Sequence, residues 1–252
     1  MSFTVGVFLL IASVLVGGMV VTLLHKLNKD RLIKVLLSLS GGFLIALAFT
    51  HFIPEIYANN WEHAGYFILF GFLIQLLLEY FSGGIEHGHI HTNNKSGTLS
   101  WTLFIALSFH SLIEGIPLDS FFLHGSVQEV SVHAHHSHYG GSLDGLLFGI
   151  ILHKIPVAVA LMTLLIASGF KQVKAWLILG AFSLMAPIGM LIGHFGALNT
   201  WFDLEVVLAI VVGMFLHIST TIIFESSENH RLNIVKLISL MAGVGLALLF
   251  VG

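Results

Sequence analysis

Long apolar runs separated by short polar segments dominate the amino-acid sequence. A bilayer-spanning helix needs about 20 mostly apolar residues, and eight runs come close to that length: 3–24, 33–54, 64–81, 99–118, 143–168, 175–195, 203–224 and 233–251. The runs show no in–out alternation, which favours helices over the strands of a membrane barrel. Because backbone groups in lipid must pair within the chain, we predict an all-α integral membrane protein. It has eight transmembrane helices in a single domain over residues 1–252.

The basic residues between the runs predict how the chain crosses the membrane. Nine of the ten Lys and Arg residues lie in or beside the four loops that follow an odd-numbered run, and the tenth, Lys154, lies within the fifth run. Cytoplasmic loops carry the excess of Lys and Arg, so these four loops are predicted to be cytoplasmic. Both termini are then extracellular or periplasmic. We expect the protein in the plasma membrane, which is the inner membrane if the cell is bacterial.

The composition agrees with this class and excludes others. Hydrophobic residues make up 56% of the chain and charged residues 9%, whereas a soluble domain carries about 25% charged residues. The absence of cysteine excludes a disulfide scaffold, and ten basic residues are too few for a nucleic-acid binder. Histidine is the unusual residue, because its 16 copies outnumber Lys and Arg together. In a membrane protein this bias favours metal or proton chemistry.

Two predicted loops are rich in histidine. The loop over 82–98 is predicted to be cytoplasmic, and the loop over 123–142 is predicted to be external. Their histidines are His87, His89 and His91 in the first and His124, His133, His135, His136 and His138 in the second. Since His-rich tracts bind divalent metals weakly, we interpret both loops as places of metal capture or release. Solubilising polar sequence is the alternative.

Three ionisable residues in the fourth and fifth runs have the spacing of a metal site. His110 and Glu114 are four residues apart and share one helical face, with Ser111 close to that face. His153 adds an imidazole from the next run. A charged side chain at the bilayer centre costs at least ~2.5–3.5 kcal/mol, so such residues usually face the bundle interior and have a function. Two imidazoles and a carboxylate suit Zn²⁺, and they also admit Fe²⁺, Mn²⁺ or Cd²⁺.

Prolines support this location. All four prolines lie within apolar runs, and Pro117 and Pro156 each follow a candidate ligand by three residues. Each removes a backbone hydrogen bond from the carbonyl just before that ligand. Broken helices at membrane depth commonly line the substrate site of a transporter. An ordinary kink is the alternative for either proline alone, but the matched placement predicts that helices 4 and 5 are kinked at the core.

Other ionisable residues in the runs have weaker assignments. His51 and Glu55 repeat the four-residue spacing near the outer end of the second run. They are a candidate entrance, with a polar helix end as the equal alternative. Glu79, at the inner end of the third run, is a candidate exit residue. His194 and His217 are single histidines on apolar helices, where a structural role is commoner than a ligand role.

Glycines in the runs are expected to allow helix backbones to approach closely. They carry no information about the substrate. The residues concerned are Gly17, Gly18, Gly41, Gly42, Gly189, Gly193, Gly243 and Gly245.

Taken together, these features resemble the ZIP (Zrt/Irt-like) family of divalent metal transporters. The resemblance covers nearly the whole chain, and its most specific motifs are FHSLIEGIPL in the fourth run and HKIPVAVAL in the fifth. Weaker similarity lies in LSLSGGFLIALAFTHFIPE, LLLEYFSGGIEHGHIH, FSLMAPIGMLIG and GMFLHIS. The resemblance implies a transport site formed by His110, Glu114 and His153. It also implies movement of spans 1, 4, 5 and 6 against the remaining spans.

The sequence departs from the family pattern around this site. Family members commonly have a carboxylate four residues after the fifth-run ligand, and here that residue is Val157. Some members bind a second metal at places that look like Ser111, Lys154 and Ala186 here. An ammonium at Lys154 would occupy the place of the second cation and pair with Glu114. We therefore predict a single-metal site, with Ser111 and Lys154 at the second-cation position.

The resulting hypothesis is transport of a divalent transition metal, with zinc as the first expectation, into the cytoplasm. An intramembrane metal-dependent hydrolase is the alternative, since it too needs buried His and carboxylate ligands with an open position. The absence of an HExxH motif and the His tracts on both sides argue against it. A passive metal channel would differ only in kinetics. We expect no cofactor apart from the transported ion; the expected partners are that ion, membrane lipid and, as a candidate, a second copy of the chain.

Overall fold

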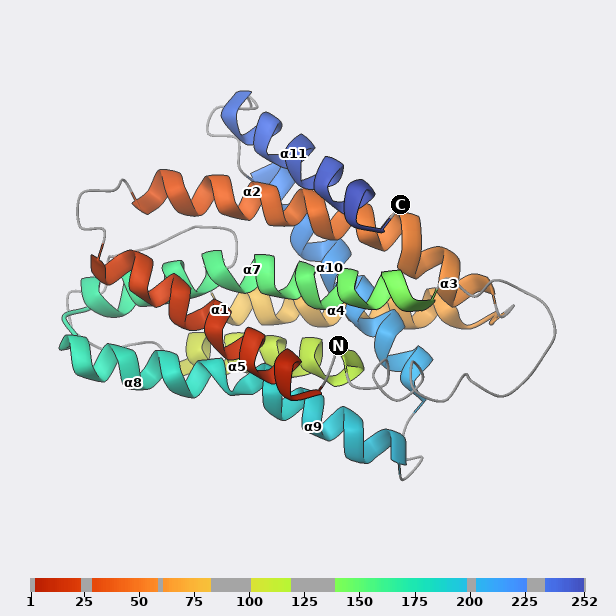
Figure 1. The fold of residues 1–252 in the computed structure, drawn as a ribbon, viewed down its shortest axis with the longest axis horizontal. Helices are drawn as coiled ribbons and strands as arrows, with labels where there is room; N and C mark the ends of the chain where they lie inside the picture. The colour runs from red at the N-terminus through yellow and green to blue at the C-terminus, as the bar shows by residue number, and fades with distance from the viewer. Residues whose placement is uncertain are drawn as a thin grey trace.

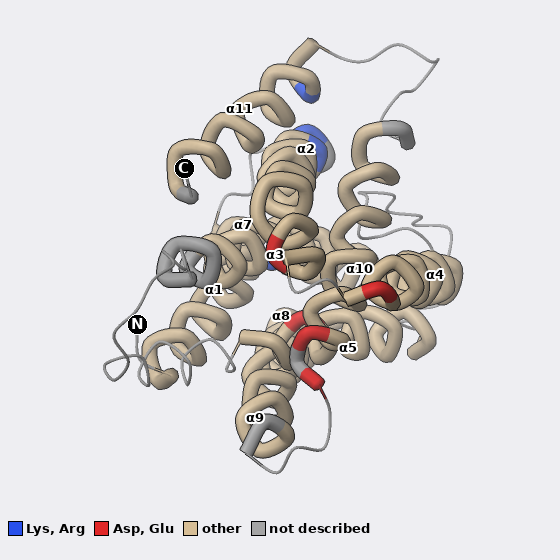
Figure 2. Tube along the Cα trace, turned by 90° about the vertical axis from the view of Figure 1, so that its right-hand side faces the viewer, with Lys and Arg blue, Asp and Glu red and all other residues tan. Residues whose placement is uncertain are grey.

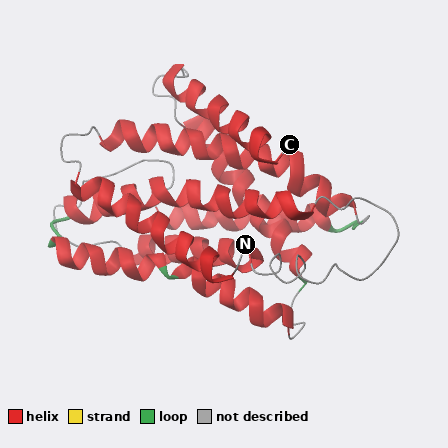
Figure 3. Cartoon of the chain, in the orientation of Figure 1, coloured by secondary structure: helices red, strands yellow, loops and turns green. Residues whose placement is uncertain are grey.

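The computed structural model describes residues 3–23, 29–58, 61–82, 101–118, 139–198, 203–225 and 234–251. Every regular element within these ranges is a helix (Figure 3). In chain order they are α1 (Phe3–Leu23), α2 (Lys29–Leu47), η1 (Ala48–Phe52), α3 (Ile53–Ala58), α4 (Ala64–Ser82), α5 (Trp101–Gly115), η3 (Ile116–Leu118), α7 (Tyr139–Ala167), α8 (Gln172–Ser183), α9 (Met185–Leu198), α10 (Leu204–Glu225) and α11 (Ile234–Val251). The helices form one elongated bundle (Figure 1).

Seven helical segments are long and apolar enough to cross a membrane. They are Phe3–Leu23, Arg31–Ala58, Ala64–Ser82, Trp101–Leu118, Gly145–Ala167, Gln172–Gly196 and Glu205–Ile223. The eighth predicted run coincides with α11, whose apolar part, Ile234–Phe250, is slightly shorter. Seen end-on, charged positions are few along the described helices (Figure 2). The chain is therefore an all-helical, multi-pass membrane protein, and the eighth crossing stays a prediction.

Three of the apolar runs are interrupted near their prolines. The second run passes from α2 through the π-helical turn η1 into α3, and Pro54 is the second residue of α3. The fourth run ends its α-helix at Gly115 and tightens into the 3₁₀ turn η3, which contains Pro117. The sixth run divides at Leu184, and Pro187 lies in the first turn of α9, where its missing N–H costs no hydrogen bond. Each irregularity falls where a backbone donor is absent.

The fifth run behaves differently, because α7 continues as one α-helix through Pro156. Its residues 157–162 are all buried, so α7 is surrounded by other helices at this level (Figure 1). The fourth run thus leaves the α-helical form at Pro117, as predicted. In the fifth run the chain stays α-helical around Pro156. Dense packing on every side of α7 holds the helix together across the missing hydrogen bond.

Glycines bring pairs of helices into direct backbone contact. A Cβ added to Gly42 of α2 would lie 2.1 Å from the carbonyl oxygen of Leu240 on α11. A Cβ on Gly243 of α11 would lie 2.0 Å from the carbonyl oxygen of Leu39 on α2. These contacts are reciprocal, and no side chain larger than hydrogen fits in either place. Helices in lipid gain no hydrophobic driving force for association, so close packing of this kind holds them together.

The same reciprocal packing joins α4 to α10 and α5 to α9. The glycines are Gly71 and Gly213 in the first pair and Gly115, Gly189 and Gly193 in the second. The predicted close backbone approach is confirmed at Gly17, Gly189 and Gly193, whereas Gly18 faces the side chains of Leu179 and Trp176. Among the described residues, nothing lies within 4 Å of a Cβ added to Gly245, and its predicted role stays a prediction. The α4–α10 and α5–α9 pairs matter for function because α4 and α5 carry the polar side chains described next.

Candidate metal site

His110 and Glu114 lie one turn apart on α5 and face inward. His110 Nε2 is 2.8 Å from Glu114 Oε1, and the two residues are 2% and 0% exposed. The four-residue spacing predicts this contact, because residues four apart stack on one helical face. The close packing of α9 against Gly115 covers the end of this helix. The pair therefore lies in the interior of the bundle.

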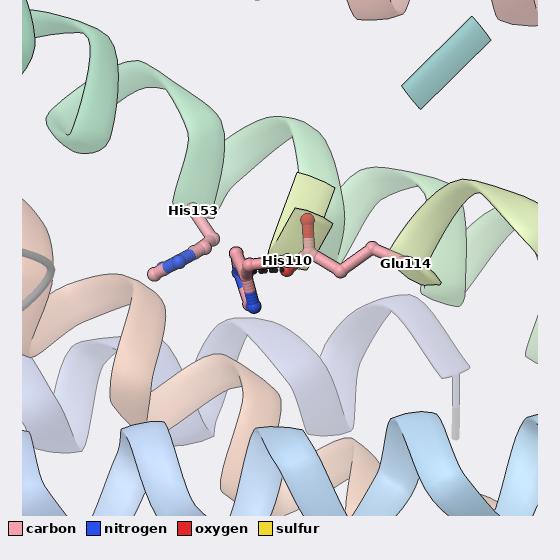
Figure 4. A group of neighbouring side chains, drawn as sticks. All are labelled: His110, Glu114 and His153. Carbon is pink, nitrogen blue, oxygen red and sulfur yellow. Dashed lines mark ion pairs between the residues drawn. The ribbon is translucent and has the colours of Figure 1, made fainter. Parts of the chain in front are cut away.

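His153 approaches the pair from α7 (Figure 4). Its ring centroid is 5.9 Å from that of His110, and one ligand atom from each of His110, Glu114 and His153 lies within 4.8 Å of the others. In the part of the chain that the structure describes, these three form the group of His, Asp or Glu residues close enough to hold one metal ion. Donor atoms around a tetrahedral Zn²⁺ are about 3.4 Å apart, from bond lengths of about 2.0–2.2 Å. The three donor atoms would therefore have to draw together from within 4.8 Å to about 3.4 Å to form such a site.

Gln75 of α4 orients the first imidazole. Its Oε1 lies 2.8 Å from His110 Nδ1, and the side chain is fully buried. An amide oxygen only accepts hydrogen bonds, so Nδ1 carries the proton. The second ring nitrogen, Nε2, then faces the carboxylate oxygen of Glu114. Two such acceptors at hydrogen-bond distance need a cation between them, either a proton or a metal ion.

Sequence reasoning missed Gln75. The available signal was a single amide within the otherwise apolar third run. Its partner lies on another helix, so no local spacing identifies the contact. Residues that hold a metal-ligating imidazole by its other nitrogen are a regular part of metal sites.

Lys154 neutralises the other side of the carboxylate. Its Nζ donates to Glu114 Oε2 at 3.0 Å and to Ser111 Oγ at 2.8 Å, and the ammonium lies 5.9 Å from the ring centroid of Phe182 on α8. All of these polar groups are buried. A buried charge must be paired, and the pairing predicted from the sequence is present. Glu114 thus addresses His110 through one oxygen and Lys154 through the other.

Two further positions at which the family pattern has a ligand are apolar and buried here: the place of the additional transport-site carboxylate and one place of the second-metal pattern. Val157 is on α7 and Ala186 is near the start of α9. Neither side chain offers a donor atom for a cation. The carboxylate of Glu114 is therefore shared between one imidazole and one ammonium in this part of the bundle.

The candidate entrance has a different environment. His51 lies in the π-helical turn η1 and Glu55 in α3, and both side chains are partly exposed. His51 Nδ1 is 2.6 Å from the exposed Thr50 hydroxyl, and Glu55 interacts electrostatically with Glu205 at the start of α10. Within the described ranges, the structure brings no third histidine or acidic residue into ligand distance of this pair. Their role as an entrance stays a prediction.

The remaining predicted residues are placed as follows. Glu79 of α4 and His217 of α10 are hydrogen-bonded to each other, a contact that the sequence analysis did not foresee. His194 of α9 packs its ring 5.7 Å from Phe3 and 5.6 Å from Phe195, as expected of a structural histidine. The loop histidines lie outside the described residues: His87, His89, His91, His124, His133, His135, His136 and His138.

Comparison with known proteins assigns the family. A family model described as ZIP Zinc transporter matches residues 83–250, which is more than half of the chain. The chain belongs to this family. No curated protein matches it. The matched range includes α5 and α7, and hence all three candidate ligands and Lys154, while Gln75 and Glu79 of α4 lie outside it.

Membership of the ZIP family has direct consequences for function. Its members transport divalent metal ions across membranes and are not enzymes, so the substrate is a metal ion and the hydrolase alternative loses its support. The apolar helices agree with a membrane transporter. A buried His/Glu group in the bundle is compatible with such a substrate.

Proposed function

We propose that the protein carries a divalent transition metal, with zinc as the first candidate, into the cytoplasm through one site formed by His110, Glu114 and His153. The observation that carries the proposal is the converging, fully buried donor set. In particular, His110 Nε2 and Glu114 Oε1 face each other across a place that needs a cation. Two nitrogens and one oxygen form a borderline donor set that suits Zn²⁺ and leaves a position for water.

A single metal is the cargo in each cycle. Lys154 supports this number because its ammonium already pairs with Glu114 Oε2 and Ser111 Oγ. A second divalent ion there would face a positive charge in a low-dielectric interior, where repulsion is strong. Removing that charge tests the idea: Lys154→Asp is expected to let purified protein bind about one more equivalent of ⁶⁵Zn. A count unchanged from that of the parent would contradict it.

The basic residues support the proposed orientation of the chain in the membrane. Apart from Lys154, the described Lys and Arg residues lie near the start of α2, α8 or α11: Lys29, Arg31, Lys34, Lys171, Lys174 and Lys236. The starts of α2 and α8 lie at the same end of the bundle, to the left in Figure 1. Under the positive-inside rule this end is cytoplasmic. Eight spans over residues 1–252, with both termini outside and in the plasma membrane, complete the proposed topology.

The parts of the chain beyond the buried site have supporting roles in the proposal. External metal is collected by the histidines of 123–142 and by His51 and Glu55, and internal metal is received by those of 82–98. Fe²⁺, Mn²⁺ and Cd²⁺ compete with Zn²⁺ for the same donors. The ion is cargo, and no resident cofactor is needed. A homodimer in the lipid bilayer is the expected assembly.

The test is uptake of ⁶⁵Zn by proteoliposomes that contain the purified chain. The parent is compared with His110→Ala and Glu114→Gln. His194→Ala serves as the matched control because it removes an imidazole that packs against Phe3 and Phe195 and lies outside the candidate ligand set. We expect saturable uptake in the parent and control, and a loss of at least about 100-fold in both site variants, from the loss of a direct ligand.

Other outcomes separate the alternatives. Unchanged uptake in folded His110→Ala and Glu114→Gln would overturn the site. Uptake that rises without saturation would favour a channel over a carrier. Absence of uptake with zinc in the parent moves the question to Fe²⁺, Mn²⁺ and Cd²⁺, which are added as competitors and as substrates in the same assay.

A further inference from the structure

A second pair of metal-binding side chains joins α4 to α10. The carboxylate of Glu79 accepts a hydrogen bond from Nε2 of His217, and the side chains are 16% and 6% exposed, respectively. The Thr221 hydroxyl lies 3.5 Å from the same Nε2. Phe72 packs edge-on against the imidazole, with ring centroids 4.7 Å apart. Carboxylate oxygen, imidazole nitrogen and hydroxyl oxygen thus meet at one place.

Glu79 lies one helical turn from Gln75, the residue of α4 that holds His110. Gln75, which holds His110, precedes Glu79 by four residues on α4, so both side chains leave the same face of that helix. One turn corresponds to about 5.4 Å along the axis. Two sets of polar contacts thus lie one turn apart on α4: Glu114–His110–Gln75 and Glu79–His217.

Along α4, the step from Gln75 to Glu79 leads toward the proposed cytoplasmic end of the bundle. Gly71 of α4 contacts Ile210 of α10. Eight residues further along α4, Glu79 contacts His217, which lies seven residues beyond Ile210 on α10. Residue numbers therefore rise together, and α4 and α10 run in the same direction. Glu79 lies near the end of α4, three residues before Ser82. An ion moving from His110 toward the end of α4 meets this pair next.

The backbone holds the pair in place. An added Cβ on Gly71 would lie 1.9 Å from the Ile210 carbonyl oxygen, and one on Gly213 would lie 1.9 Å from the Ile68 carbonyl oxygen. The two helices are thus in contact directly before the two side chains. A site held by rigid elements keeps its geometry better than one on loops. Its two side chains are also more exposed than those of the buried site.

We infer that Glu79 and His217 form a second metal station, which binds the divalent ion after it leaves His110 and Glu114. This inference rests on the proposed transport function. Two protein donors, a nearby hydroxyl and water bind a divalent ion more weakly than the three buried ligands do. Weaker binding toward the exit is what release requires, because conduction needs sites that an ion can both enter and leave.

Metal binding to the purified full chain tests the station. The double variant Glu79→Gln with His217→Gln is compared with the parent by equilibrium dialysis against ⁶⁵Zn. The control Glu62→Gln with His63→Gln makes the same two changes in the exposed turn before α4. We expect the test variant to bind about one equivalent less than both parent and control. Metal bound by the loops cancels in this difference, and uptake at saturating zinc should fall about tenfold.

A structural role for the pair gives a different result. Gln at position 79 retains an acceptor for His217, so the single variant Glu79→Gln preserves a purely structural hydrogen bond. If folded Glu79→Gln and the double variant keep the parent's metal count and uptake, the station is overturned. If the parent shows no uptake but the metal count still falls by one, the station stands and the transport proposal fails.

A thiol variant covers the case in which the double variant does not fold. The chain has no cysteine, so Glu79→Cys introduces a lone thiolate beside His217, which should bind Cd²⁺ tightly. We expect Cd²⁺ to inhibit zinc uptake at about tenfold lower concentration in Glu79→Cys than in Glu79→Ser. Equal sensitivity of the two variants would overturn the station.

Discussion

The chain contains two His–Glu pairs with the same four-residue spacing, but the two pairs differ in burial and in the side chains that surround them. His110 and Glu114 on α5 are buried, and His153 of α7 lies beside them. His51 and Glu55 follow one another through a π-helical turn into α3, and both are partly exposed. Both pairs lie next to a proline, so neither spacing nor proline separates them. Their difference comes from what the neighbouring helices supply.

The inner pair is completed by two other elements. α7 contributes both an imidazole and the ammonium of Lys154, and α4 contributes Gln75. In the outer pair, His51 contacts the neighbouring Thr50 hydroxyl, and Glu55 interacts with another carboxylate, that of Glu205. The His–Glu spacing thus predicts only that two side chains share one face of a helix. The further ligand and the balancing charge have to come from other helices. The predictions below test this comparison.

The largest expected effect is on folding, after loss of the inner carboxylate. Glu114→Ala leaves the Lys154 ammonium buried without its charge partner, which costs about 3–5 kcal/mol of stability. Glu55→Ala, at a partly exposed place, is expected to cost about 0.5 kcal/mol or less. Thermal unfolding of the purified variants measures both. In the double variant Glu114→Ala with Lys154→Met, stability should return while zinc uptake stays absent. Equal destabilisation by Glu114→Ala and Glu55→Ala would remove the distinction between the two pairs.

A smaller effect is expected from the residues that orient each imidazole. Gln75→Leu removes the buried acceptor of His110 Nδ1 and should weaken zinc binding about tenfold. Thr50→Val removes the exposed hydroxyl beside His51 Nδ1, where water substitutes, and should change affinity less than about twofold. The concentration that half-saturates ⁶⁵Zn uptake reports both. If Gln75 were only a packing residue, Gln75→Leu would leave this value at that of the parent.

The smallest effect is expected from the outer pair itself. His51→Ala with Glu55→Ala should raise the half-saturating zinc concentration about threefold, because an exposed two-ligand place binds metal weakly in water. The maximal rate should stay that of the parent, since the buried site is untouched. Initial rates of uptake over a range of zinc concentrations separate the two quantities. A fall in maximal rate equal to that of His110→Ala would make the outer pair part of the transport site.

Several structural features were predictable because they depend on neighbours along the chain. Each apolar run coincides with a described helix, since a continuous apolar run in lipid has no other way to pair its backbone. The helix break near Pro117 follows from a missing donor. The contact between His110 and Glu114 follows from helical periodicity.

Other features have causes that lie far apart in the sequence. The division of the sixth run at Leu184 and the π-helical form of η1 were not predicted. Pro187 and Pro54 lie close to them, but a proline alone does not show which form the backbone takes around it. Gly71 and Gly213 were not singled out, although they hold α4 against α10. A glycine in an apolar run becomes a contact only when a particular carbonyl is opposite.

The sequence by itself determined the membrane class of this protein, its helical elements, the inward-facing His–Glu pair and, through its motifs, its family. Those properties follow from local hydrogen bonding, the cost of charge in lipid and the fixed pitch of a helix. Only the tertiary structure decided that Gln75 holds His110, that Glu79 meets His217 and that the inner pair is buried while the outer pair is not. Each of these depends on which helices touch and at what register, and that is set by packing across the whole bundle.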